Sequence, residues 1–306
     1  MNNKSTPLTD RILLLTASTL WRIMELMRYT LKDFKEEYPD DKACLLAVLE
    51  NRYGDTCPKC GVVGTKFYPI TGRKAFACLH CRKHIYPLAD TIFRKSETSL
   101  WNWFYAIFQF SVAKNGVSAK ELERTLGVTY KTAWRMCKQI RLLMEQDGDP
   151  LDGEVEVDET YIGGRRKLAH KFDNKSIVFG QVERNGRAKI SHVKTAGARV
   201  LLPVIQEGVA LTAQIYSDEW RSYKSLPKYG YTHTTVNHSA LEYVRGSAHT
   251  NTIEGFWSQL KRSIDGTYHA VSPKYLQSYL NEFTFRYNMR GVPICPVLLE
   301  RAVKLS

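Results

Sequence analysis

The chain has 306 residues, 43% of them hydrophobic and 25% charged, which is enough for two or three domains with sizeable cores. Lys and Arg number 44 against 31 Asp and Glu, giving a formal net charge of +13. This surplus suggests a polyanionic partner, with nucleic acid first, and a generally basic protein without such a partner is the alternative. No apolar run approaches the roughly 20 residues that cross a bilayer, so we expect no membrane partner.

The N-terminal third is predicted to contain a helical extension over residues 1–28 and a zinc-ribbon region over residues 29–95. Four of the seven cysteines form two close pairs, Cys57 with Cys60 and Cys78 with Cys81, separated by 17 residues. Two C-x2-C knuckles can direct four thiolates at one ion, which predicts a closed, tetrahedral structural zinc site. A redox pair and chance clustering are the alternatives. The scattered remaining cysteines indicate a reducing compartment.

Residues 96–149 are predicted to form a helical, helix-turn-helix-like DNA-binding unit. Ala119–Leu126 and Tyr130–Met144 have helical patterns, with Gly127 in the turn and Thr129 as a cap. An ordinary helical hairpin with a solvated basic face is the alternative. The aromatic residues of the preceding helix are expected to be core. The second helix carries four cations that could reach phosphates or base edges: Lys131, Arg135, Lys138 and Arg141.

Residues 150–306 change to strands followed by helices, which predicts an α/β domain. Val155 and Val157 alternate with polar residues, as in a half-buried strand. Asn185-Gly186 between two strand-like segments predicts a tight hairpin. The polar stretch Glu145–Pro150 before this domain is a plausible linker, so DNA binding and chemistry are expected in separable parts of the chain.

Three carboxylates of this domain can converge from different elements. Asp158 lies in a strand, Asp218 ends another, and Glu254 lies one turn into a helix. Such clusters hold Mg²⁺ or Mn²⁺ in two-metal phosphoryl chemistry. Lys261 follows Glu254 by seven residues, so both project from one helical face and the lysine can contact DNA phosphate. The alternative is a pair of strand-end acids beside a solvated helix face.

Longer motifs around these acids resemble the prokaryotic insertion-sequence DDE transposases with an N-terminal zinc ribbon. The resemblance runs from Tyr29 to the C-terminus, about nine-tenths of the chain. It is carried by Val157-Asp-Glu-Thr-Tyr-Ile-Gly-Gly164, Tyr216-Ser-Asp-Glu-Trp-Arg-Ser-Tyr223, His249-Thr-Asn-Thr-Ile-Glu-Gly-Phe-Trp-Ser-Gln-Leu-Lys-Arg262, Gly266-Thr-Tyr-His269 and Glu282-Phe-Thr-Phe-Arg-Tyr-Asn288.

The resemblance implies an RNase H-like catalytic domain with a mixed sheet, in which Asp158, Asp218 and Glu254 are catalytic and bind Mg²⁺ or Mn²⁺. Some relatives are described with Asn as the third residue, which makes Asn251 an alternative to Glu254. The expected contacts to the DNA backbone are basic residues near these motifs: Arg165, Arg166, Lys261 and Arg262.

The implied function is a DNA transposase that binds the terminal inverted repeats of an insertion sequence, cleaves there and joins the freed 3′ hydroxyl to target DNA. The expected partners are double-stranded DNA and further copies of the chain, because two DNA ends must be paired. The expected location is the cytoplasm, on the nucleoid. The alternatives are a transposase-derived DNA-binding protein that no longer cuts and a zinc-stabilised nuclease without strand transfer.

Overall fold

The computed structural model describes residues 29–146, 148–163, 175–236 and 249–304. The chain forms two compact units, Met1–Ser111 with Gly291–Ser306, and Val112–Arg290. The predicted extension over residues 1–28 lies outside the described residues. The domain boundaries at residues 95 and 149 stay a prediction, since the compact units group the chain differently. Within the described ranges, no helix is both long and apolar enough to cross a membrane.

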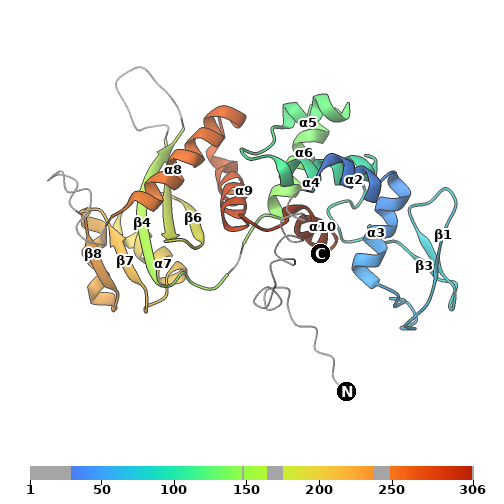
Figure 1. Cartoon of the computed structure of the whole chain (residues 1–306), viewed down its shortest axis with the longest axis horizontal. Helices are drawn as coiled ribbons and strands as arrows, with labels where there is room; N and C mark the ends of the chain where they lie inside the picture. The colour runs from blue at the N-terminus through green and yellow to red at the C-terminus, as the bar shows by residue number, and fades with distance from the viewer. Residues whose placement is uncertain (1–28, 147, 164–174, 237–248, 305–306) are drawn as a thin grey trace, which may run out of the picture. The chain divides into compact units, whose positions relative to one another are not determined.

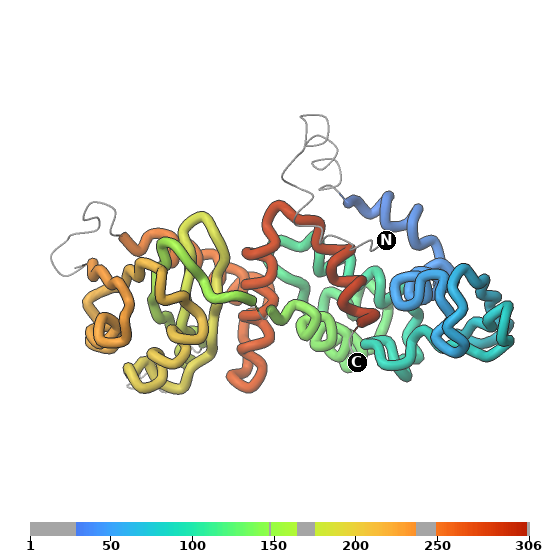
Figure 2. The backbone as a smooth tube through the Cα atoms, turned by 90° about the horizontal axis from the view of Figure 1, so that it is seen from below, coloured from blue at the N-terminus to red at the C-terminus, as the bar shows by residue number. Residues whose placement is uncertain are grey.

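The first unit combines helices with a small antiparallel sheet of strand order β1-β2-β3. Its elements are α2 (Leu31–Glu37), α3 (Asp41–Tyr53), β1 (Phe67–Pro69), β2 (Phe76–Cys78), β3 (His84–Ile85), nearly all of α4 (Leu100–Val112) and α10 (Ile294–Lys304). The C-terminal helix α10 packs against α3, from which it is far removed in sequence (Figures 1 and 2).

Aromatic side chains form the core of the helices in this unit. Phe34 is fully buried and stacks on Phe108 with ring centroids 5.1 Å apart. Trp103, Phe104 and Phe110 of α4 are also buried. The prediction that the aromatic residues of this segment are mainly core is therefore confirmed, because burial removes their faces from any base-stacking surface.

The second unit begins with two helices joined by a tight turn, as the sequence predicts. These helices are α5 (Ala119–Leu126) and α6 (Tyr130–Leu142). Gly127 has φ 64°, a left-handed conformation that glycine adopts without strain. The Thr129 hydroxyl accepts a hydrogen bond from the Thr132 backbone N–H at 3.3 Å and caps α6.

A mixed five-stranded sheet follows, in the order β6-β5-β4-β7-β8. The three strands β4, β5 and β6 are antiparallel neighbours, whereas β7 runs parallel to β4 and β8 parallel to β7. The strands are β4 (Glu154–Ile162), β5 (Ser176–Glu183), β6 (Ala188–Val193), β7 (Gln214–Ser217) and β8 (Thr232–Thr235). The antiparallel pairing of β5 with β6 and the φ of 58° at Asn185 confirm the predicted hairpin, and the mixed sheet with its helices confirms the α/β class.

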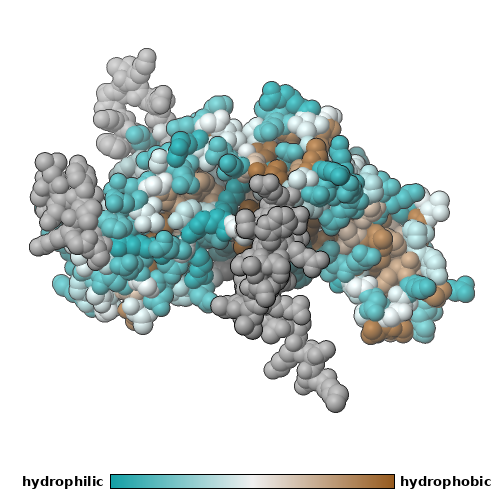
Figure 3. Space-filling model, in the orientation of Figure 1, coloured by the Kyte–Doolittle hydropathy of each residue, from teal (hydrophilic) through white to brown (hydrophobic). Residues whose placement is uncertain are grey.

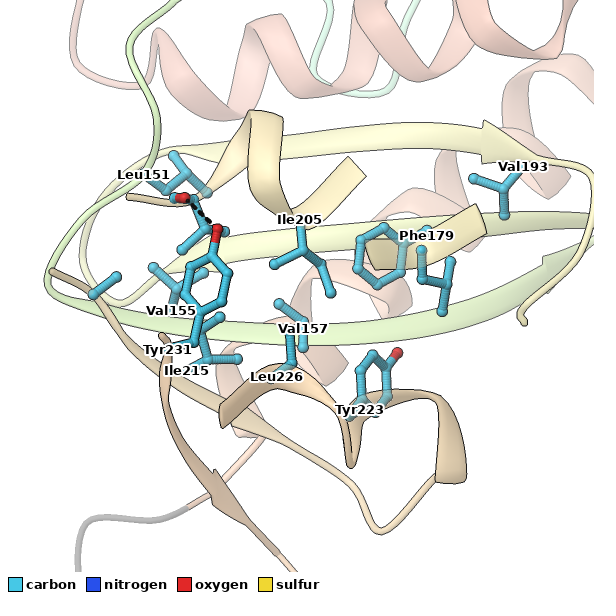
Figure 4. Close-up of a cluster of buried hydrophobic side chains, with 13 residues drawn as sticks. Leu151, Val155, Val157, Phe179, Val193, Ile205, Ile215, Tyr223, Leu226 and Tyr231 are labelled. Carbon is cyan, nitrogen blue, oxygen red and sulfur yellow. Dashed lines mark hydrogen bonds between the residues drawn. The ribbon is translucent and has the colours of Figure 1, made fainter. Parts of the chain in front are cut away.

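Helices cover both faces of this sheet. One face packs on α7 (Ala198–Gly208), and its core includes Val155, Val157 and Ile205 (Figure 4). The other face packs on α8 (Asn251–Ser263) and α9 (Leu276–Asn288). Residues 264–268 continue α8 as one π-helical turn, and a 3₁₀ turn over Pro273–Tyr275 precedes α9.

Side chains of α9 cover the backbone of β6, which is an edge strand. Asn288 accepts a hydrogen bond from the Ala188 N–H at 2.7 Å and donates to the Ala188 carbonyl at 2.9 Å. Gln277 accepts from the His192 N–H at 2.7 Å and donates to the Ile190 carbonyl at 3.1 Å. These amides satisfy backbone groups that a neighbouring strand would otherwise pair.

A buried charge cluster joins α6 to α9. The Glu282 carboxylate accepts hydrogen bonds from Arg141 Nε at 2.6 Å, Arg286 Nη1 at 2.6 Å and the Tyr268 hydroxyl at 2.8 Å. Arg141 is only 3% exposed, and its guanidinium stacks over the Tyr279 ring at 3.9 Å. The prediction that Arg141 could contact DNA is therefore wrong, because its guanidinium is buried and paired with Glu282.

Candidate active site and metal centre

The four paired cysteines come together in the ribbon. Their Sγ atoms all lie within 4.8 Å of one another, and those of Cys57 and Cys81 are 3.9 Å apart. Thiolates about 2.3 Å from a tetrahedral zinc ion are separated by about 3.8 Å, so this donor set fits structural zinc with a closed shell. Gly61 and Arg82, which follow the two pairs, have φ values of 72° and 58°, so the backbone takes a left-handed conformation after each pair.

The three predicted catalytic acids lie on neighbouring elements. Asp158 is in the middle of β4, Asp218 directly follows β7, and Glu254 is in the first turn of α8. Since β7 pairs in parallel with β4 and α8 packs on β4, the topology brings the three chain segments to one region. The segments are far apart in sequence, so the sheet order creates this proximity.

The charges of these acids influence one another. Burial raises the pKa of Asp158 to about 6, and the negative charges of Asp218 and Glu254 act in the same direction. The Trp257 indole N–H donates to Asp158 Oδ2 at 2.8 Å, which opposes the rise. A partly desolvated carboxylate beside two other acids favours a bound cation, because a cation relieves both the repulsion and the lost hydration.

A glycine makes room for the contact between Trp257 and Asp158. Gly180 of β5 pairs with Asp158 of β4, and a Cβ atom at Gly180 would lie 2.5 Å from the Trp257 ring. Any side chain at residue 180 would therefore displace the indole. The backbone of β5 thus allows α8 to approach the strand that carries the first acid.

The other two acids have local partners. Asp218 Oδ1 accepts from the Trp220 backbone N–H at 3.0 Å, and Glu254 Oε1 accepts from the Thr250 hydroxyl at 3.1 Å. In the described ranges, only the cysteine cluster brings three or more possible metal-ligating atoms within 4.8 Å of one another. The acids therefore lie in electrostatic range without forming so tight a cluster.

A fourth carboxylate, Glu159, which the sequence reasoning missed, interacts electrostatically with these acids. Burial raises the pKa of Glu159 to about 7, and the charges of Asp158 and Asp218 contribute. The hydroxyl of Tyr223, a buried residue, donates to Glu159 Oε2 and opposes the rise. The signal in the sequence was the adjacent acid pair, but strand alternation sends the two side chains to opposite faces.

Most described cations predicted to contact DNA are exposed. Lys131 and Arg135 are exposed on α6, and Lys261 and Arg262 are exposed near the C-terminal end of α8. Exposure leaves these side chains able to approach phosphate. Lys138 is also exposed, Arg141 is buried, and Arg165 and Arg166 lie outside the described residues.

Two protein-family models match the chain. Residues 39–84 match a transposase zinc-ribbon domain, and residues 150–288 match an ISXO2-like transposase domain. Together the two matches cover more than half of the chain, and they contain the cysteine pairs and the three acids respectively.

Two curated proteins are similar to the chain. An uncharacterized protein in transposable element ISH50 of Halobacterium salinarum is 25% identical over 286 residues, which cover 85% of this chain and 96% of that protein. An uncharacterized transposase-like protein of Haemophilus influenzae is 28% identical over 114 residues, 37% of this chain and 91% of that protein. The similarity to the first extends over nearly its whole length.

Proposed function

Since the chain belongs to the insertion-sequence transposases that carry a zinc ribbon and an ISXO2-like transposase domain, we propose that it cuts and joins DNA at the ends of an insertion sequence. The observation that carries the proposal is the arrangement of Asp158, Asp218 and Glu254. They come from a strand, the residue directly after a second strand, and a helix, and the charges of Asp218 and Glu254 act on Asp158. Separate elements supplying acids to one region are what two-metal phosphoryl transfer requires.

We infer that the sheet unit is an RNase H-like domain. Its three antiparallel strands are followed by two parallel ones, and the first strand of the unit is central. This order places the first acid in the central strand and the second at the end of the adjacent parallel strand. Strand order and acid positions thus support the same assignment.

The same three acids would hold Mg²⁺ or Mn²⁺, since carboxylates suit hard divalent cations. Bound metal would supply charge stabilisation for attack on the phosphodiester and for the leaving oxygen. Trp257 orients the Asp158 carboxylate through its 2.8 Å hydrogen bond. Glu254 is favoured over Asn251 as the third residue, because its charge acts on Asp158 and a neutral amide binds Mg²⁺ less well than a carboxylate.

The ribbon has the charge expected of a DNA-binding surface. Residues 56–89 contain six Lys and Arg and no Asp or Glu. Tyr68 and Tyr86 in this region are 51% and 50% exposed. We propose that the ribbon and the α5–α6 pair bind the terminal repeats, with Lys131 and Arg135 contacting phosphate.

The catalytic unit would approach DNA through a polar surface. One face of this unit, at the left of Figure 3, is mainly hydrophilic. Lys261 lies on the same helix as Glu254 and could contact backbone phosphate beside the acids. We propose that two or more copies pair the two ends, because strand transfer needs both ends together. The reaction would take place on the DNA of the nucleoid, in the cytoplasm.

The test is a cleavage and joining assay with labelled DNA that carries the flanking repeats, in Mg²⁺ or Mn²⁺. We expect nicked and joined products from the unmodified chain. Asp218→Asn should retain repeat binding in a gel shift and lose both products. Asp149→Asn, which removes an exposed acid outside the candidate site, is the matched control and should behave as the unmodified chain.

The outcomes separate the alternatives. Nicked DNA without joined DNA would indicate a nuclease, and binding without either product would indicate a DNA-binding protein that no longer cuts. Wild-type cleavage by Asp218→Asn would exclude the assigned acids from the reaction.

A further inference from the structure

A buried carboxylate on β4 reaches the start of the helix that carries the third acid. Glu156 precedes Asp158 by two residues, so both side chains project from the same face of the strand. Glu156 is fully buried, and its Oε2 accepts a hydrogen bond from the Ile253 backbone N–H at 2.9 Å. Ile253 is the residue directly before Glu254. One strand therefore supplies the first acid and holds the backbone beside the third.

This contact caps helix α8 from another element, because the N-cap residue of α8 supplies no side-chain capping bond. Thr250 occupies the N-cap position but makes no side-chain capping bond, and its hydroxyl donates to Glu254 instead. The first N–H groups of a helix have no partner within the helix. A carboxylate at this end also interacts favourably with the helix dipole. Glu156 meets both needs from another element.

Arg184, which directly follows β5, completes the attachment. Its Nε donates to Glu156 Oε1 at 2.7 Å, and its Nη2 donates to the His249 carbonyl at 2.7 Å, in the segment that enters α8. The Arg184 side chain is 9% exposed and its guanidinium lies 4.1 Å from the centre of the Tyr216 ring. The positive charge makes burial of the Glu156 carboxylate tolerable, and the planar guanidinium bonds two groups at once.

We propose that Glu156 and Arg184 are positioning residues that fix Glu254 relative to Asp158, an inference that rests on the proposed function. The Trp257 bond to Asp158 provides a second attachment one helical turn after Ile253. Two attachments to one strand fix both the rotation and the axial position of α8. Metal-binding acids need this precision, because partners outside the ligand set hold ligands in productive geometry.

A purely structural ion pair would contribute to stability without affecting the metal requirement, so the two roles can be separated. Glu156→Gln keeps the side-chain volume, but one of the two oxygens that accept from Ile253 and Arg184 becomes an NH2 group, which cannot accept. Glu154→Gln is the matched control, since Glu154 is on the same strand and also bonds Arg184, at 3.1 Å, but is 45% exposed. Arg184→Lys is a second variant that keeps the charge and loses the two-bond geometry.

The first measurement is hydrogen exchange of the full chain, read at the start of α8. Glu156→Gln should speed exchange there by about ten-fold, because a hydrogen bond to a charged acceptor is lost. Glu154→Gln should leave the exchange rate there unchanged. Unchanged exchange in Glu156→Gln would overturn the attachment, whether or not the chain cuts DNA.

The second measurement is the Mn²⁺ concentration that gives half-maximal cleavage of repeat DNA. Glu156→Gln and Arg184→Lys should raise it by about ten-fold or more, with the rate recovering at high Mn²⁺. An unchanged Mn²⁺ requirement alongside faster exchange would overturn the positioning role. Absence of cleavage by the unmodified chain would instead refute the proposed function, and the exchange result would still decide whether Glu156 anchors α8.

Discussion

Replacement of Glu282 by Gln should destabilise the second unit strongly. Gln has the same shape but no charge, so Arg141 and Arg286 would keep two positive charges in a site where their side chains are 4% and 10% exposed. Removing one partner of a buried ion pair costs about 3–5 kcal/mol. The stacking of Arg141 on Tyr279 survives the substitution and places the expected loss near the lower end, about 3 kcal/mol.

The assay is urea or thermal unfolding of the full chain, followed for the second unit. A loss of about 3 kcal/mol corresponds to a fall in Tm of roughly 6–12 °C for a unit of this size. Glu123→Gln is the matched control in the same unit, because Glu123 forms an i,i+3 pair with Lys120, whose side chain is 67% exposed. That pair should contribute less than about 1 kcal/mol.

Acid should abolish the difference between Glu282→Gln and the unmodified chain. Burial by itself would raise the pKa of Glu282, but the charges and hydrogen bonds of Arg286 and Arg141 hold it below its ordinary 4.5. A depressed carboxyl pKa stabilises the fold above the unfolded pKa, and this contribution disappears as the pH falls through the folded pKa. A Glu282→Gln variant whose free energy of unfolding at neutral pH lies within about 1 kcal/mol of the unmodified chain would refute the stabilising role of the buried charge cluster.

Four further predictions follow from the site and its surroundings. Cys57→Ser with Cys60→Ser should remove bound zinc, measured by metal analysis, and unfold the ribbon; a folded ribbon with free thiols would contradict the zinc centre. DNA affinity should fall steeply with salt in gel shifts, because each neutralised phosphate releases counterions. In cleavage assays Glu254→Gln should be inactive and Asn251→Ala only weakened, and the reverse ranking would reassign the third residue. Burial holds the pKa of His233 below 6.5, so the unfolded chain binds more protons than the folded chain near this pH. The free energy of unfolding should therefore fall as the pH drops below 6.5. In urea unfolding, His233→Gln should reduce this dependence of stability on pH.

The sequence predicted those parts of the fold that depend on local chemistry. Gly127 and Thr129 mark a turn and a cap whatever surrounds them, and Asn185-Gly186 favours a tight hairpin in any antiparallel pair. The cysteine spacing likewise contains most of the geometry of its cluster. The structure confirms these features. They could be predicted because each signal depends on residue types at short, fixed spacings.

Contacts between distant segments could not be predicted in the same way. Arg141 shares the helical spacing of exposed basic residues, and only the packing of α9 on α6 gives it a buried partner, Glu282. Glu156 looks like an ordinary polar residue between two valines, since nothing nearby indicates that α8 begins above it. A polar residue at a polar position of the alternation gives no sequence signal for such a contact.

Separability of DNA binding from chemistry stays a prediction, but the structure changes what a truncation would test. A fragment ending before Glu145 would lose Glu282 and expose the buried face of α6. We therefore expect point substitutions such as Asp218→Asn to separate binding from cleavage more cleanly than deletion of the sheet unit.

The amide side chains along α9 also affect how copies of this chain can meet. An open sheet edge can recruit a strand from another molecule and begin aggregation. At β6, Gln277 and Asn288 already occupy backbone donors and acceptors that an incoming strand would use. If copies of the chain meet on neighbouring DNA ends, as we propose, these amides would protect them from strand exchange at this edge. Substitutions of Gln277 and Asn288 would leave these backbone groups of β6 free to pair with a strand of another molecule, while every acid of the candidate site stays unchanged.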